Sequence, residues 1–108
     1  MALPHAQPLD TIDVRPLGAG LRDAVTTSLI KTPTIQLMRL VLRAGLGLPE
    51  HSVPGAISVQ CLEGEAVVTT PGRDCPLHAG ELVVLAGGEV HAVRAVTDAS
   101  LLVTVLLG

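Results

Sequence analysis

Short apolar runs separated by turn-forming residues dominate the chain from residue 25 onward. They recur about every eight to twelve residues, a spacing typical of a β-sandwich or barrel. β-Branched residues fill most of the runs, and the runs are too short for amphipathic helices. We therefore predict an all-β domain of eight or nine short strands. The runs cover residues 25–30, 34–42, 56–62, 66–70, 75–77, 82–85, 90–96 and 101–107.

The first twenty residues have a different character, because proline, glycine and alanine are frequent and no apolar period is visible. Such a segment predicts an arm with little regular structure of its own. We therefore divide the chain into an arm at residues 1–20 and a single domain at residues 21–108. The arm can be loose or can lie across a partner subunit.

The last run, residues 101–107, is apolar on nearly both faces. A strand of this kind is normally covered on both sides. A second sheet or a second subunit would supply the other cover. Together with the arm, this run leads us to expect a homodimer.

Composition narrows the class of protein. The chain has 108 residues, enough for one domain, and 48% of them are hydrophobic while none is aromatic. The core must therefore be aliphatic, and base stacking on aromatic side chains is excluded. The formal net charge is −3 and the seven basic residues are scattered. We expect neither nucleic acid nor a membrane as a partner.

Two cysteines, Cys61 and Cys75, are too few and too irregularly spaced for a disulfide framework. We expect two reduced, partly buried thiols. The first residues lack the basic and apolar regions of a signal peptide, and no apolar stretch is long enough for a transmembrane helix. These features lead us to expect a cytoplasmic protein.

Glycine and histidine recur at fixed spacings in the middle of the chain. Five residues separate Gly45 from His51, and Gly64 follows in the phrase Leu-Glu-Gly-Glu. This stretch resembles the first motif of the cupin superfamily, G-x5-H-x-H-x3-E-x6-G. Val53 occupies the position of the second histidine and Ile57 that of the glutamate.

A second set of residues resembles the second cupin motif, G-x5-P-x-G-x2-H-x3-N. Gly80, Gly88 and His91 match it, whereas Ala86 replaces the proline and Ala95 the asparagine. The two motifs occur in the expected order and span residues 45–95. The segment from His51 to Gly55 also resembles a subgroup of small single-domain cupins with a His-x-x-Pro-Gly motif.

The resemblance implies a cupin double-stranded β-helix, a jelly-roll barrel, with a site on its inner wall. In cupins three histidines and one glutamate hold a divalent Fe, Mn, Ni or Zn ion, ligands that suit these metals. This chain keeps only His51 and His91, so the implied metal site is weak or absent. The two histidines can instead line a ligand pocket with Val53 and Ile57. By strand alternation from Ile57, Cys61 would also point inward.

Other titratable residues are less promising. We expect Glu50 at the barrel rim, Glu63 and Glu65 in solvent beside a turn, Glu81 fixing a turn, and His78 exposed. No nucleophile–histidine pair or phosphate loop can be argued from the spacing.

Three functions remain open. The first is a module that binds a small, largely apolar molecule through His51 and His91. The second is a metal-dependent cupin enzyme, a dioxygenase or isomerase, that uses these histidines and a further ligand. The third is a structural role as a dimeric partner of another protein. Fold alone does not choose among them.

Overall fold

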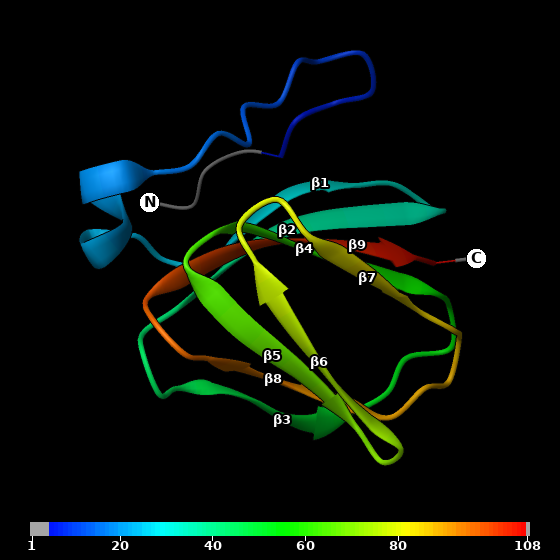
Figure 1. The fold of residues 1–108 in the computed structure, drawn as a ribbon. Helices are drawn as coiled ribbons and strands as arrows, with labels where there is room; N and C mark the ends of the chain where they lie inside the picture. Colours follow the sequence, from blue (N-terminus) through cyan, green and yellow to red (C-terminus); the bar gives the residue numbers. More distant parts are fainter. Residues whose placement is uncertain (1–4, 108) are drawn as a thin grey trace.

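Two antiparallel sheets face each other and roll into a barrel in the computed structural model, which describes residues 5–107 (Figure 1). The prediction of an all-β domain with eight or nine strands is confirmed. The elements are the 3-10 helix η1 (Gly18–Asp23) and the strands β1 (Thr27–Lys31), β2 (Ile35–Leu42), β3 (Gly47–His51), β4 (Ile57–Glu63), β5 (Glu65–Thr70), β6 (Arg73–His78), β7 (Leu82–Leu85), β8 (His91–Ala95) and β9 (Ala99–Leu106).

Strands distant in the sequence are neighbours in both sheets. One sheet has the order β1-β2-β9-β4-β7 and the other the order β3-β8-β5-β6. Strand β9 lies between β2 and β4, so the end of the chain closes the first sheet. This crossing of early and late strands produces a jelly-roll barrel rather than a meander.

Strand β3 was not among the predicted strands, because Gly45, Gly47 and Pro49 indicate a break. It forms at the edge of its sheet and pairs only with β8. A proline is tolerated there because an edge strand does not need every backbone N–H for pairing. This strand brings His51 to the barrel wall.

Alternate residues of the strands fill the space between the sheets. On β4, for example, Ile57, Val59 and Cys61 are buried while the residues between them are partly exposed. The core is aliphatic, as the composition requires, and its largest fully buried side chain is Leu101. This packing leaves one end of the barrel hollow.

The glycines that carry the family resemblance have a common backbone conformation. Gly45, Gly64, Gly80 and Gly88 all have φ between +80° and +91°. At Gly64 an added Cβ would also lie 2.1 Å from the carbonyl oxygen of Asp98. Only glycine meets both conditions without strain, which explains its place in the Glu63–Glu65 turn.

The N-terminal arm runs along the outer side of the five-stranded sheet (Figure 1). The predicted arm of residues 1–20 contains no helix or strand from His5 to Leu17, but the 3-10 helix η1 begins within it at Gly18, and residues 1–4 lie outside the described residues. The amide of Ala6 donates to the carbonyl oxygen of Leu29 at 2.9 Å, and the His5 ring bonds the Ser28 hydroxyl. The arm is therefore docked on the barrel.

Glu63 makes the second attachment, and our expectation that it is simply solvated is wrong. Its carboxylate accepts hydrogen bonds from the amides of Leu17 at 2.8 Å and Gly18 at 3.0 Å. It also accepts one from the hydroxyl of Ser100, a fully buried residue of β9, at 2.6 Å. Glu63 thus links the arm to both β4 and β9.

Within residues 5–107, no helix is long and apolar enough to cross a membrane.

Candidate functional site

A cavity of about 760 Å³ lies between the two sheets, where β3 ends and β4 and β8 begin. Strands β2, β4 and β9 contribute eight of the seventeen lining residues, mostly through the inward-facing side chains that the alternation predicts. Among residues 5–107, three with polar side chains line it, His51, His91 and Gln36, and none of the lining residues there carries a charge while the histidines are neutral. The aliphatic wall includes Met38, Leu40, Ile57, Val59, Val103 and Val105.

Four of the five residues expected in the pocket line this cavity: His51, Val53, Ile57 and His91. His51 and His91 are opposite each other in the β3–β8 pairing, although they are 40 positions apart in the sequence. Their ring centroids are 4.3 Å apart and the rings are tilted by 57°. The two imidazoles therefore form one polar group in a wall that is otherwise apolar except for Gln36.

Backbone carbonyl groups hold both rings. The Nδ1 of His51 lies 2.9 Å from the carbonyl oxygen of Pro49, and the Nδ1 of His91 lies 2.9 Å from that of Glu89. A carbonyl oxygen only accepts, so each Nδ1 carries the hydrogen and donates it. In the neutral rings Nε2 is then an acceptor on both histidines. His91 is only 3% exposed, whereas His51 is exposed.

The structure places Cys61 away from the cavity, which corrects our expectation for this residue. Its side chain does face inward, but it lies four residues beyond Ile57, about 13 Å further along the strand. There it is fully buried in the core, and its thiol donates to the carbonyl oxygens of Gly64 at 3.3 Å and Glu63 at 3.5 Å. Burial raises the pKa of the Cys61 thiol. The two-residue alternation of the strand correctly predicted that Cys61 faces inward, but it did not predict how far along the barrel Cys61 lies.

Gln36 is a cavity residue that the sequence reasoning missed. It precedes Met38 and Leu40 on β2, so the same alternation that orients these side chains also turns Gln36 inward. Its Nε2 donates to the hydroxyl of Ser28 at 3.2 Å. Because its side chain is polar, Gln36 did not stand out as an inward-facing residue. Its position two residues before Met38 nevertheless predicts that it lies on the same face of the strand.

The surroundings of the cavity contain too few metal donors for a resident catalytic ion. Among residues 5–107 no three His, Cys, Asp or Glu side chains come together in a way that could hold a metal. Val53 and Ile57, which stand where cupins have ligands, provide aliphatic wall instead. Two imidazoles do not match the three protein ligands that catalytic metals usually have.

Glu81 and His78 lie at a turn outside the cavity. The carboxylate of Glu81 accepts a hydrogen bond from the amide of His78 at 2.8 Å and contacts its ring at 3.0 Å. Both residues are exposed, and the bond to the His78 amide lowers the pKa of Glu81. The expected role of Glu81 in fixing this turn is confirmed.

Comparisons with known proteins agree with the fold. A conserved protein of unknown function from Streptococcus pyogenes is 22% identical over 100% of this chain and 98% of its own, with a TM-score of 0.79. An RmlC-like cupin from Desulfovibrio desulfuricans is 25% identical, with 97% of both chains covered and a TM-score of 0.71. A protein described as a predicted oxalate decarboxylase from Thermotoga maritima is 24% identical over 77% of this chain and 79% of its own, with a TM-score of 0.68.

No curated protein matches the sequence. A family model described as a cupin domain, however, matches residues 38–107, which include both motifs, the two histidines and strand β9. The aligned solved structures have the same barrel, and the family model covers well over half of the chain. This chain therefore belongs to the cupin family.

Proposed function

We propose that this cupin binds a small, largely apolar molecule in the barrel cavity and holds it by one polar end at His51 and His91. The observation that carries the proposal is the cavity itself, whose largely aliphatic wall contains the paired imidazoles and, apart from them, one polar side chain among the described residues, Gln36. Pockets for small molecules are typically apolar with a few convergent polar groups. Their usual volume, roughly 300–1,000 Å³, includes the value found here.

The orientation of the rings restricts the polar end of the ligand. Because each Nδ1 donates to a backbone carbonyl, the neutral rings offer acceptors at Nε2. A ligand that binds either Nε2 must bring a hydrogen-bond donor, such as a hydroxyl or amide N–H group. The apolar remainder would lie against Ile57, Val59 and Val103 on the opposite sheet.

A pair of matched probes tests both parts of the proposal. 1-Hexanol and 1-methoxypentane have the same number of heavy atoms, but only the alcohol has an O–H donor. In methyl NMR titrations we expect 1-hexanol to shift the signals of Val59 and Val103 saturably. The ether should bind about 2- to 10-fold more weakly, the range that corresponds to one net hydrogen bond.

Variants locate the interaction. The double variant His51→Ala/His91→Ala should remove the preference for the alcohol, whereas His78→Ala, which changes an exposed histidine outside the cavity, should leave it unchanged. No saturable shift with either probe would overturn the proposed binding function. Equal binding of both probes would overturn the role of the histidines in fixing the ligand.

Metal analysis tests the competing function of a metal-dependent enzyme. The protein should be purified without a nickel column and measured for Fe, Mn, Ni and Zn. We expect far less than one metal ion per chain. Stoichiometric metal that is lost in both His51→Ala and His91→Ala would favour the enzyme over the binding module.

A further inference from the structure

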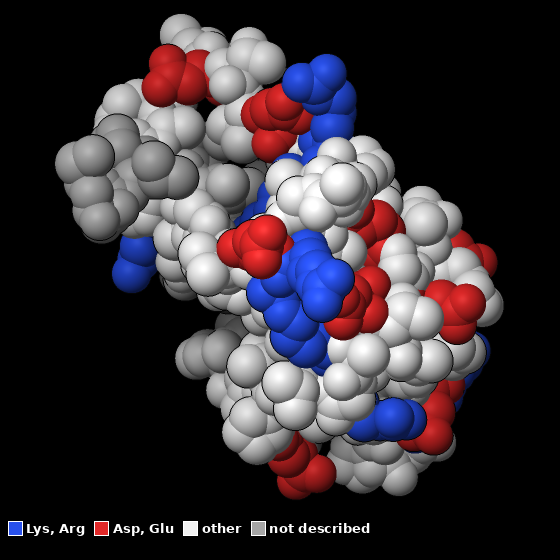
Figure 2. Space-filling model, turned by 90° about the vertical axis from the view of Figure 1, so that its left-hand side faces the viewer, with Lys and Arg blue, Asp and Glu red and all other residues white. Residues whose placement is uncertain are grey.

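Basic and acidic side chains are interspersed on the face of the molecule shown in Figure 2, without a large area of one sign. One basic side chain, however, is buried rather than exposed at the surface. Arg39 on β2 is 7% exposed, and its charge is therefore held against the barrel rather than in water. Arginine is rarely buried to this extent without an anionic partner.

The hydrogen bonds of Arg39 are incomplete within residues 5–107. Its Nη2 donates to the backbone carbonyl oxygen of Asp13 at 3.3 Å, but Nη1 is buried and has no partner there. No carboxylate of the described residues forms an ion pair with Arg39. A buried charge without direct compensation is costly, so this guanidinium is suited to receive an anion.

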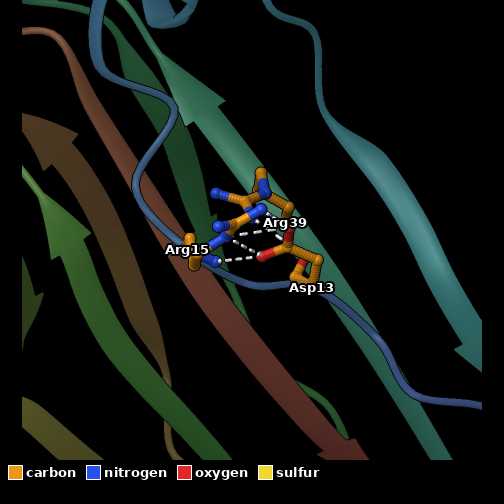
Figure 3. Close-up of polar contacts among 3 residues, drawn as sticks. All are labelled: Asp13, Arg15 and Arg39. Carbon is orange, nitrogen blue, oxygen red and sulfur yellow. Dashed lines mark hydrogen bonds and ion pairs between the residues drawn. The ribbon is translucent and has the colours of Figure 1, made fainter.

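Arg39 lines a hollow of about 390 Å³ between the arm and the five-stranded sheet. The other lining residues, Asp13, Arg15, Pro16 and Leu17, all belong to the arm. Figure 3 shows Arg15 and Arg39 meeting at Asp13, whose side chain bonds Arg15 and whose backbone carbonyl accepts from Arg39. The three side chains together carry a charge of +1.

We propose that this hollow, between the arm and the outer face of the barrel, binds an oxyanion group, a phosphate or a carboxylate, through Arg39 and Arg15. A guanidinium presents parallel N–H donors that match two oxygens of such a group. Nη1 of Arg39 supplies a donor that no residue of the described chain uses. Arg15 is mostly exposed and can swing aside to admit the anion, since its ion pair with Asp13 lies at the surface.

Two carboxylates near the hollow limit the charge of the ligand. Asp13 already pairs with Arg15 at 2.8 Å, so an incoming anion must share or replace that partner. Glu63 faces the arm from the barrel, but its oxygens are taken by Leu17, Gly18 and Ser100. A small oxyanion fits this balance better than a polyanion, which would be repelled by both carboxylates.

Titrations with inorganic phosphate and with acetate test the site, with sodium chloride at matched ionic strength as the reference. We expect the Arg39 Nε–Hε cross-peak in ¹⁵N NMR spectra to shift saturably with phosphate, acetate or both. The arm amides should exchange more slowly with solvent when the anion is bound. The stronger of the two probes identifies the natural group as a phosphate or a carboxylate.

Four variants provide the controls. Arg15→Gln should weaken binding about 10-fold, the loss expected for one charge-assisted hydrogen bond. Asp13→Asn should strengthen it by removing a competing carboxylate, while its amide oxygen can still accept from the Arg15 backbone. Arg73→Gln and Asp74→Asn change exposed charges on β6 and should have no effect.

Two results would overturn the proposal. The first is the absence of a saturable shift in the wild-type protein with either anion. The second is an equal change in affinity for Asp13→Asn and Asp74→Asn, which would indicate a response to net charge alone. Both readouts use folded protein in which Arg39 is retained, so they do not depend on the stability of an Arg39 variant. Neither involves the barrel cavity, and failure here would leave the proposed binding function untouched.

Discussion

Glu63 joins the N-terminal arm to the barrel, and replacing it by glutamine should destabilise the protein. One carboxylate oxygen accepts from both the Leu17 amide and the Ser100 hydroxyl, and the other accepts from the Gly18 amide. A glutamine can keep two of these bonds through its amide oxygen. Its NH₂ group would then face the N–H of Gly18, where two donors meet and no bond forms.

The expected loss in the free energy of unfolding can be worked out from these three hydrogen bonds. Hydrogen bonds to charged groups contribute about 1.5–3 kcal/mol and neutral ones about 0.5–1.5 kcal/mol. Two bonds weakened by about 1 kcal/mol each and one lost bond worth about 2 kcal/mol give about 4 kcal/mol. Because Glu63 is partly exposed, solvent reduces this figure, and we expect a loss of about 2 kcal/mol in the free energy of unfolding for Glu63→Gln.

The destabilisation caused by Glu63→Gln should also depend on pH. Desolvation alone would raise the pKa of Glu63, but the bonds from Leu17, Ser100 and Gly18 and the nearby charge of Arg39 outweigh it, so the pKa is lowered. A lowered pKa in the folded state stabilises the protein above the unfolded value, about 4.3. This contribution is lost as the pH falls through the folded pKa. The difference between wild type and Glu63→Gln should therefore shrink below about pH 4.

Urea unfolding followed by far-ultraviolet circular dichroism measures this effect, since the chain has no aromatic residue to report by fluorescence. Glu65→Gln is the matched control, because Glu65 flanks the same glycine and its side chain is exposed. Hydrogen exchange at Leu17 and Gly18 should accelerate in Glu63→Gln alone. Equal stability of the two variants at pH 7 would refute the assigned role of Glu63.

Three further predictions concern the turn glycine, the cysteines and the assembly. Gly64→Ala should lower the free energy of unfolding by at least about 2 kcal/mol more than Gly72→Ala, because the first site has φ +80° and a backbone clash while the second is open; equal losses in urea would contradict this. In native protein, iodoacetamide should modify Cys75 at least about 10-fold faster than the fully buried Cys61, as followed by mass spectrometry. Comparable rates would show that the core around Cys61 opens readily. The apolar strand β9 and the arm lead us to propose a homodimer, which light scattering should report as a mass of two chains; a stable monomer would exclude it.

Much of the architecture was predictable because it depends on local patterns. The two-residue alternation along each strand places Ile57, Val59 and Cys61 on one face wherever that strand lies in the fold. The resemblance to the two cupin motifs likewise implied that His51 and His91 meet, and the structure pairs them across β3 and β8. Turn glycines such as Gly64 were recognisable because few other residues adopt a positive φ.

Two kinds of feature were decided only by the tertiary structure. They are the position of a residue along the barrel and the contacts between segments that are remote in the sequence. Alternation assigned Cys61 to the inner face, but the closure of the barrel put Cys61 in the filled core and brought Gln36, which was not predicted, to the cavity. The attachment of the arm joins Glu63 to Leu17, 46 positions away, and no local pattern specifies that contact. The same docking buries Arg39, which the sequence alone presents as one of seven scattered cations. The sequence determines the chemical type of each side chain. Whether that side chain is buried, and which groups it contacts, is determined only when distant segments pack together.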